Sequence, residues 1–383
     1  MEMAEATLSE KLSRHHIDLQ LDEIPPCVVA AAKLHILDSL GCLLAGSRLE
    51  PGKLAYDLAV ASSDSGSTSS LLGTVSRVSF LDAVQAMSVA AHCGEMDDIH
   101  SGAGTCIGGM IVPALLAVAE KHGGSGRDFL TGAIVGYETT ARVGLAINAP
   151  SLFTRGWWPS TLCGVFGVAA AGAKFLRWSL DKTVNVLGIA SLSAGGMITG
   201  GHEGATARHL IFGRAAQSGV LSLLAATQGF TGPKRALEDP RGFCLTLCAE
   251  PKWEYLQGAE PYCLPAVAFK PYPCARQLHA GVEALLRLLE DHSVTSTAIE
   301  AIELSVPTAV TSLVHRPAVS TNRAATLGSG QYVMAVTAIR KKMDLTSFDE
   351  RFLQSSEVQS LMSKVKGEIE LDRYWRSSCI DRP

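Results

Sequence analysis

The most informative stretch of the chain runs Glu95-Met96-Asp97-Asp98-Ile99-His100 and continues with Gly108-Gly109-Met110-Ile111-Val112-Pro113-Ala114-Leu115-Leu116. Three carboxylates and an imidazole stand directly before a long apolar run. Ionisable groups beside a buried helix cost stability unless they are paired or used in chemistry. The pattern therefore predicts a polar cluster at the entrance to a core helix.

The composition indicates a compact globular chain with more than one domain. Of its 383 residues, 47% are apolar and 18% are charged, which is too much chain for one small core. The net charge of −4 shows no excess of basic residues of the kind that binds nucleic acid. No apolar run reaches the length of a membrane span without Gly, Pro or polar interruption, and residues 1–5 lack a signal-peptide pattern. We expect a cytoplasmic protein that binds a small molecule, with no nucleic-acid or membrane partner.

The cysteines give no sign of a metal centre. Ten are scattered through the chain, mostly in apolar stretches, which indicates reduced and buried thiols. Cys244 and Cys248 have a helical spacing, but no second Cys or His pair completes a zinc site. We therefore expect no metal, and activity that survives EDTA.

Apolar periodicity and the positions of Gly and Pro divide the chain into two regions. The first, residues 1–264, is predicted to be mostly helical, with helices over residues 26–40, 81–92, 110–121, 127–146 and 162–176. The last of these is rich in Ala and Gly and is expected to be central. The second region, residues 265–383, is predicted to be mixed α+β, with a strand over residues 298–306 and helices over residues 275–289, 331–340 and 355–365.

A series of short landmarks carries a family resemblance. In order, they occupy residues 33–41, 95–100, 113–120, 136–138, 155–159, 229–232, 242–243, 269–276, 279–280 and 332–333. One landmark alone is weak, but the ordered set is specific and extends over about residues 10–365. On these residues the chain resembles the MmgE/PrpD family, which includes 2-methylcitrate dehydratases and cis-aconitate decarboxylases.

The resemblance implies a mainly α fold with a smaller α+β lid, as residues 1–264 and 265–383, and an active site in the cleft between them. It also implies a cofactor-free enzyme, commonly a homodimer. Family members remove a proton beside an activated carbon of a small di- or tricarboxylate and then lose water or CO2. The chain stops at Pro383, earlier than is usual in the family, so we expect an incomplete lid sheet.

Three departures from the family pattern bear on the chemistry. Cys106 and Trp158 stand where the family usually has histidines, and Arg208 replaces a lysine, whereas Lys270 and Tyr332 match. Neither a thiol nor an indole exchanges protons near neutral pH as imidazole does. The substrate is therefore expected to be larger and more apolar, with one carboxylate or carbonyl. We expect no turnover of cis-aconitate or 2-methylcitrate.

The residues before the core helix are catalytic candidates, each with a structural alternative. Asp97 and Asp98 would orient the substrate or act as a base, although Asp is also a common helix cap. We favour a pocket position for one of them. His100 is the strongest remaining base candidate, with a surface-loop histidine as the alternative. Glu95 would share the role of the aspartates.

Candidates for substrate contact lie farther along the chain. Arg208 and Lys270 would bind a carboxylate or polarise a carbonyl, or else form structural ion pairs. Tyr332 would donate a proton or hydrogen bond, or else pack in the core. His202, in a Gly-rich loop, would supply the missing imidazole, or else be a satisfied loop histidine.

Two indoles and a thiol complete the predicted site. The Gly and Pro flanks and the family position of Trp157 and Trp158 favour cleft walls over ordinary packing. Cys106 is expected to line the site rather than act as a nucleophile, because no Cys–His pair is evident in the sequence.

Three functions remain open at this stage. The first is a lyase of specialised metabolism that performs a dehydration, decarboxylation or proton shift. The second keeps the scaffold for an isomerisation or cyclisation, including a pericyclic one, which an aromatic cleft promotes by holding a reactive conformer. The third is a non-catalytic family member that acts as a binding subunit.

Overall fold

The computed structural model describes residues 6–258, 261–307 and 322–370, and the chain divides into two compact units. Unit 1 comprises Met1–Ile198 and Ala207–Phe269, and unit 2 comprises Thr199–Thr206 and Lys270–Pro383. The element order confirms a mainly helical fold with a smaller α+β part. The sequence did not predict that the short segment Thr199–Thr206 would belong to the second unit.

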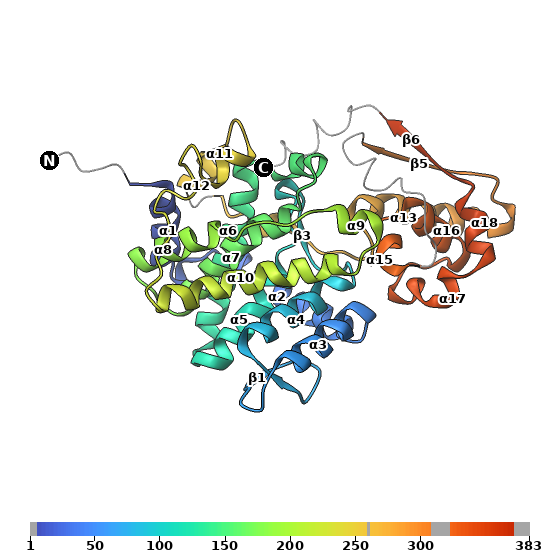
Figure 1. Cartoon of the computed structure of the whole chain (residues 1–383). Helices are drawn as coiled ribbons and strands as arrows, with labels where there is room; N and C mark the ends of the chain where they lie inside the picture. The colour runs from blue at the N-terminus through green and yellow to red at the C-terminus, as the bar shows by residue number, and fades with distance from the viewer. Residues whose placement is uncertain (1–5, 259–260, 308–321, 371–383) are drawn as a thin grey trace. The chain divides into compact units, whose positions relative to one another are not determined.

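Unit 1 is built from helices packed on one another (Figure 1). They are α1 (Leu8–Asp18), α2 (Pro26–Gly46), α3 (Glu50–Ser62), α4 (Phe80–Cys93), α5 (Gly108–His122), α6 (Gly126–Ala146), α7 (Pro159–Phe175), α8 (Leu180–Ser191), α10 (Ala207–Thr227), α11 (Phe243–Leu247) and α12 (Glu254–Gln257). All five helices predicted for this region are present.

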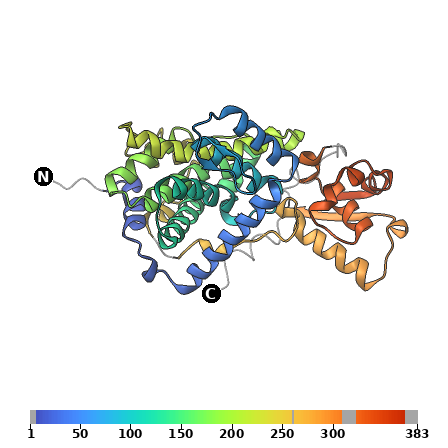
Figure 2. The ribbon, with the colours of Figure 1, turned by 90° about the horizontal axis from the view of Figure 1, so that it is seen from below.

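Helix α7 is the centre of unit 1, as its small residues predict. It packs against α5, α6, α8 and α10, and nearly all of its side chains are buried. At Gly167 a Cβ atom would lie 1.9 Å from Thr140 Oγ1 of α6, so only glycine permits this close approach. Figure 2 shows α6 and α7 running together through the helical unit.

Local sequence signals set where several of these helices begin. Pro26 and Pro159 occupy first helical positions, where a missing N–H costs nothing. Ser125 caps α6 in a reciprocal capping box with Asp128. Helix α5 ends before Gly123, whose φ of 70° suits a residue without Cβ.

Two short antiparallel ladders join distant segments of unit 1. β1 (Ser69–Ser70) pairs with β2 (Arg77–Val78), and β3 (Ile99–His100) pairs with β4 (Val267–Ala268). The second pairing holds the segment after Glu95–Asp98 against the last part of the unit and so restricts the polar cluster.

Unit 2 contains a two-stranded parallel sheet and short helices. The strands are β5 (Ile302–Pro307) and β6 (Val365–Glu370), paired from Ile302↔Val365 to Pro307↔Glu370. The helices are α9 (Thr199–Glu203), α13 (His279–Asp291), α15 (Arg323–Thr326), α16 (Gly330–Arg340), α17 (Glu350–Leu353) and α18 (Ser356–Met362).

One helix prediction in unit 2 was partly wrong. The expected helix over residues 355–365 ends at Met362, and Val365 starts strand β6. Residues 365–370 read Val-Lys-Gly-Glu-Ile-Glu, an alternating pattern that satisfies the open backbone edge of β5. The segment beginning at Trp375, on which the expectation of a shortened lid depended, lies outside the described residues.

Two helices are long and apolar enough to cross a membrane by length and composition alone, although both contain the polar interruptions noted in the sequence. They are Pro26–Gly46 (α2) and Ala207–Thr227 (α10), and core helices of soluble proteins pass the same test. Half of the tested window of α10 is buried, and this helix packs on α4 and α7. Helix α2 turns the buried polar residues His35 and Ser39 towards the interior of unit 1.

Candidate active site

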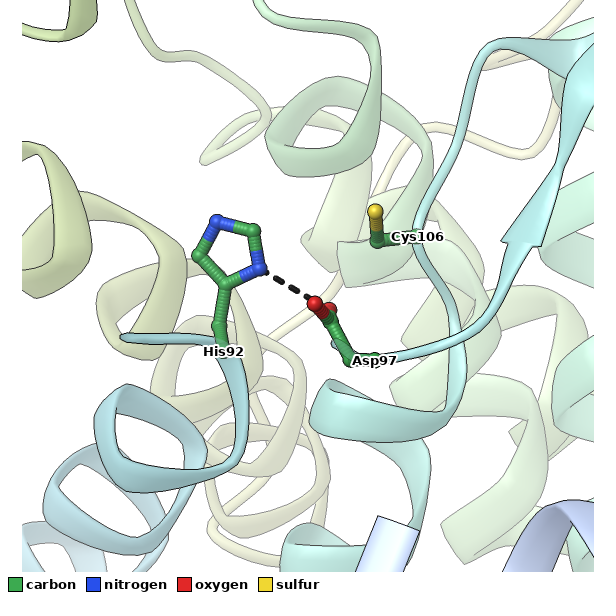
Figure 3. Close-up of side chains that lie close together, drawn as sticks. All are labelled: His92, Asp97 and Cys106. Atoms are coloured by element: carbon green, nitrogen blue, oxygen red, sulfur yellow. Dashed lines mark hydrogen bonds and ion pairs between the residues drawn. The ribbon is translucent and has the colours of Figure 1, made fainter. Parts of the chain in front are cut away.

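A buried imidazole–carboxylate pair lies at the entrance to helix α5. His92, at the end of α4, places Nδ1 2.8 Å from Asp97 Oδ2 (Figure 3). The two side chains are 1% and 0% exposed. A carboxylate only accepts, so Nδ1 carries the hydrogen and Nε2 is the ring atom left to accept a proton.

Aromatic rings hold the imidazole of His92 in place. Phe212 stacks on it at 4.0 Å with an interplanar angle of 12°, and Trp158 lies at 5.3 Å with a tilt of 50°. Phe212 comes from α10 and Trp158 caps α7, so three helices meet at this ring. Within the described part of the chain, Nε2 has no hydrogen-bond partner. The protein thus presents a fixed imidazole with one available nitrogen.

An ion pair adjoins the imidazole on its Nε2 side. Arg208 Nη2 donates to Glu95 Oε2 at 3.1 Å, and Glu95 Oε2 lies 4.0 Å from His92 Nε2. Glu95 has a left-handed backbone with φ of 54°, which is uncommon for a residue with a side chain and is found at functional sites. The Arg208 guanidinium also lies over the Trp158 ring, and its Nε has no hydrogen-bond partner among the described residues.

The thiol of Cys106 completes this group, the His92 cluster of His92, Glu95, Asp97, Cys106 and Arg208. Cys106 donates its backbone N–H to Ser160 Oγ at 3.0 Å and is 6% exposed. One ligand-type atom each from His92, Asp97 and Cys106 lies within 4.8 Å of the others. In Figure 3 the sulfur lies on the Asp97 side of the ring, and Nε2 points away from it. This arrangement differs from a nucleophilic Cys–His pair.

Helix termini favour negative charge in this region. Helices α5, α7 and α10 begin at Gly108, Pro159 and Ala207, close in sequence to Cys106, Trp158 and Arg208. The N-terminus of a helix carries a partial positive charge, which stabilises nearby anions. This field suits both the Asp97 carboxylate and an anionic substrate.

Asp98 has a structural position, although it is next to Asp97 in sequence. Its Oδ1 accepts the N–H groups of Ile107 and Gly108, at 3.3 and 2.9 Å, at the start of α5. Its Oδ2 accepts the Tyr137 hydroxyl at 2.6 Å and lies 2.9 Å from His35 Nδ1. Of the two aspartates, Asp97 therefore joins the imidazole and Asp98 anchors the helix.

His100, the expected base, is used as a turn cap. Its Nδ1 accepts the N–H of Ala103 at 3.0 Å, and its backbone pairs with Thr105 and Val267. Burial lowers the pKa of His100, so the ring stays neutral at pH 7. It is absent from the group of atoms formed by His92, Asp97 and Cys106.

The two neighbouring indoles point to different places. Trp158 is 4% exposed, and its ring lies beside that of His92. Trp157 lines a separate cavity of about 510 Å³ together with Arg155, Leu192 and Phe243. The structure therefore does not bring the two rings to one cavity, and a role for Trp157 in the site stays a prediction.

The remaining candidates belong to unit 2. Tyr332 is fully buried there, donates its hydroxyl to the Ser347 carbonyl at 2.7 Å and packs beside Phe348. The one hydrogen that the Tyr332 hydroxyl can donate is therefore already bonded within unit 2. Lys270 begins the long segment of unit 2. His202 lies in α9, and its side chain is outside the described part of the structure.

Sequence reasoning missed His92 and Phe212. His92 precedes Glu95 by one helical turn, and Gly94 directly after the helix signals a helix end. Extending the acidic motif backwards across this boundary would have included His92. Phe212 carries no such signal, because only the packing of α10 on α4 brings it to the ring.

Two models of one protein family match most of the chain. Residues 10–256 match the MmgE/PrpD N-terminal domain, and residues 272–374 match the MmgE/PrpD C-terminal domain. Together with the two-unit helical architecture, these matches define a two-domain MmgE/PrpD protein. The chain belongs to the MmgE/PrpD family, as its ordered landmarks indicated.

Curated relatives extend over nearly all of the chain. It is 27% identical over 385 residues to the cis-aconitate decarboxylase-like protein oryM of Aspergillus oryzae, covering 94% of this chain and 79% of that protein. It is 27% identical over 387 residues to cis-aconitate decarboxylase of Aspergillus terreus, covering 94% and 78%. The cis-aconitate decarboxylase of Mus musculus is 27% identical over 373 residues, covering 91% and 73%.

Proposed function

We propose that the protein is a lyase that moves a proton on a carbon beside a carboxylate or carbonyl group. The observation that carries this proposal is the 2.8 Å contact between His92 Nδ1 and Asp97 Oδ2 in a buried site. Family membership and the decarboxylase relatives support the reaction class. The pair supplies an imidazole in place of the two that the resemblance leads us to expect at positions 106 and 158.

In this mechanism His92 Nε2 exchanges the proton. Asp97 fixes the tautomer through Nδ1–H and stabilises the imidazolium formed when Nε2 accepts a proton. In a decarboxylation Nε2 first takes a proton from water; the bond to the leaving carboxylate then breaks, CO2 departs, and the imidazolium gives that proton to the carbanion carbon. In a dehydration Nε2 removes the carbon-bound proton and hydroxide leaves as water after protonation.

The substrate class follows from the charges and rings of the site. Arg208 is the cation of the His92 cluster, and its Nε is an available donor for one carboxylate or carbonyl oxygen. Trp158 and Phe212 add apolar surface beside it. These features support a substrate with one anionic group and an apolar body, rather than a tricarboxylate, in specialised metabolism.

Steady-state kinetics test the role of the imidazole. With a panel of carboxylate and carbonyl substrates that includes cis-aconitate, His92→Asn and Asp97→Asn should each lower kcat about 100-fold or more, since general acid–base catalysis contributes this much. His122→Asn, on an exposed position, is the matched control. Wild-type activity in His92→Asn would contradict the proposal. Rapid itaconate formation would contradict the substrate class but leave the lyase intact.

A cyclase or isomerase is the second candidate, supported by the aromatic group of His92, Trp158 and Phe212. A reaction promoted by shape would need no titrating group, so its rate would be flat between about pH 6 and 9. The lyase should instead give a bell-shaped profile that His92→Asn abolishes. A binding subunit without catalysis would turn over no substrate in either assay.

We also propose that the protein forms a homodimer through helix α2. Leu34, Leu37 and Leu44 are 55%, 66% and 44% exposed, and they share one face of this helix with Gly41. A continuous exposed apolar face is unusual for a monomer and marks an interaction site. A second copy of the same helix would cover it.

A further inference from the structure

We infer that His92 Nδ1, Asp97 and Cys106 form a zinc-binding site with three protein ligands and an open fourth position. The ligand atoms all lie within 4.8 Å of one another, and Nδ1 and Oδ2 are 2.8 Å apart. A tetrahedral zinc ion holds neighbouring donor atoms roughly 3.3 to 3.6 Å apart, given its bond lengths. Zinc binding would lengthen the 2.8 Å contact and shorten the separations that reach 4.8 Å, changes of about an ångström.

The chemistry of the donors selects the metal. One imidazole nitrogen, one thiolate and one carboxylate oxygen suit zinc, whereas magnesium and calcium prefer oxygen ligands alone. The charges also fit a buried site, where an uncompensated ion is costly. Thiolate and carboxylate together offset the two charges of Zn²⁺, while Arg208 already pairs with Glu95 at 3.1 Å.

The surroundings orient each ligand. Phe212 fixes the ring plane of His92, and the Cys106 backbone is held by Ser160. With zinc on Nδ1, the Nε2–H faces the Glu95 carboxylate at 4.0 Å, the kind of partner that metal-bound histidines have. A zinc ion with three protein ligands has a fourth position for a water or substrate oxygen. This replaces the expectation from the sequence that the chain lacks a ligand set.

Direct binding measurements test the site without any substrate. The full chain, stripped with a chelator, is titrated with ZnCl2 and separately with CoCl2. We expect one ion per chain and a thiolate-to-cobalt charge-transfer band. Cys106→Ser should lose the band and weaken zinc binding at least about tenfold, whereas Cys163→Ser, another buried thiol of unit 1, should behave as wild type.

Two outcomes would overturn the site: no stoichiometric binding, or a cobalt band that survives Cys106→Ser. Circular dichroism establishes that each variant is folded. If Cys106→Ser does not fold, Asp97→Asn decides the matter, because it keeps the thiol and should still weaken zinc binding. Unchanged zinc affinity in Asp97→Asn would then refute the inference.

The effect of zinc on activity rests on the proposed function. Zinc on Nδ1 leaves the hydrogen on Nε2, so His92 can no longer accept a proton and turnover should fall until EDTA restores it. If zinc binds through Cys106 but raises turnover, His92 is not the base and the zinc site stands. If zinc does not bind, this inference is wrong and the lyase proposal is unaffected.

Discussion

The Arg208 guanidinium lies 5.3 Å from the centre of the Trp158 ring and over its face. Arg208 is only 11% exposed, so this cation–π contact is largely desolvated, and such contacts contribute about 2 kcal/mol. The contact joins two of the positions at which the resemblance predicts a departure from the family pattern. Arg208 and Trp158 lie together beside His92.

Replacing Trp158 should impair turnover more than replacing Trp157. Trp158→Leu keeps much of the volume but removes the cation–π contact, so kcat/KM should fall roughly 30-fold, the equivalent of about 2 kcal/mol. Trp157→Leu is the matched control, because its ring lines a different cavity. Equal losses in the two variants, measured by steady-state kinetics, would show that the cation–π contact is not used.

Removing the Asp98 carboxylate should destabilise the fold. Asp98→Ala leaves the N–H groups of Ile107 and Gly108 without their acceptor, which should cost about 3 kcal/mol in unfolding free energy. Burial and then the Asp98 charge raise the pKa of Tyr137 well above its usual range, so Tyr137 remains a donor. Guanidinium chloride unfolding measures the loss. Asp57→Ala, at an exposed position, should stay within about 0.5 kcal/mol of wild type.

Two glycine substitutions should have opposite signs. Gly108→Ala would place a Cβ 2.1 Å from Ser39 Oγ and 2.3 Å from the Tyr137 hydroxyl, so overpacking should cost about 1–3 kcal/mol. Gly41→Ala meets nothing within 4 Å inside helix α2 and should stabilise by up to about 1 kcal/mol. Thermal melts distinguish the two, and a stable Gly108→Ala protein would contradict the packing at the start of α5.

Stability should fall as the pH drops below about 6.5, because His16 is buried and its pKa is well below that of a free histidine. Burial is the main cause, followed by the charges of His15, Arg142 and Lys174. In this window the unfolded chain binds more protons than the folded one. The unfolding free energy should therefore decrease by up to about 1.4 kcal/mol per pH unit for this group.

Denaturation series from pH 5 to 8 measure this slope. His16→Leu should flatten it, because the variant has no proton to bind at this position. The control is His122→Leu, at an exposed position. An unchanged slope in His16→Leu would assign the pH dependence to other groups.

A charge on the exposed face of α2 should break the proposed dimer. Leu37→Glu places a carboxylate among Leu34 and Leu44, so light scattering should report the mass of one chain instead of two. Leu192→Glu, at a residue that is 75% exposed and directly follows α8, should leave the mass unchanged. A monomeric wild-type chain would contradict the homodimer.

Much of unit 1 could be predicted from sequence because its helices are strongly apolar and have local start signals. Capping at Ser125 and prolines at positions 26 and 159 give nearly the observed boundaries. Strand β6 was missed because its alternation is short and directly follows a helix. A strand of this length forms only when a partner such as β5 lies beside it, and pairing between distant segments has no local signal.

For the candidate site, the sequence by itself determined the acidic motif, the loss of two histidines and the family landmarks. It also identified Arg208 and Trp158 as residues near the site. It did not separate Asp97 from Asp98, because adjacent residues differ only in the direction of their side chains. The residues that each carboxylate meets decide between them, and those residues come from other helices.

Only the tertiary structure placed His92 beside Asp97 in the candidate site. Packing of α10 on α4 puts Phe212 against the ring, and the turn at Glu95 brings Asp97 back to Nδ1. His100 instead caps the turn that ends at Ala103 and is held by pairing with Thr105 and Val267. The sequence shows which side chains can exchange protons. Which histidine keeps a nitrogen without a hydrogen-bond partner depends on burial and on contacts with other side chains. Those contacts come from residues far apart in the chain, so the sequence alone does not reveal them.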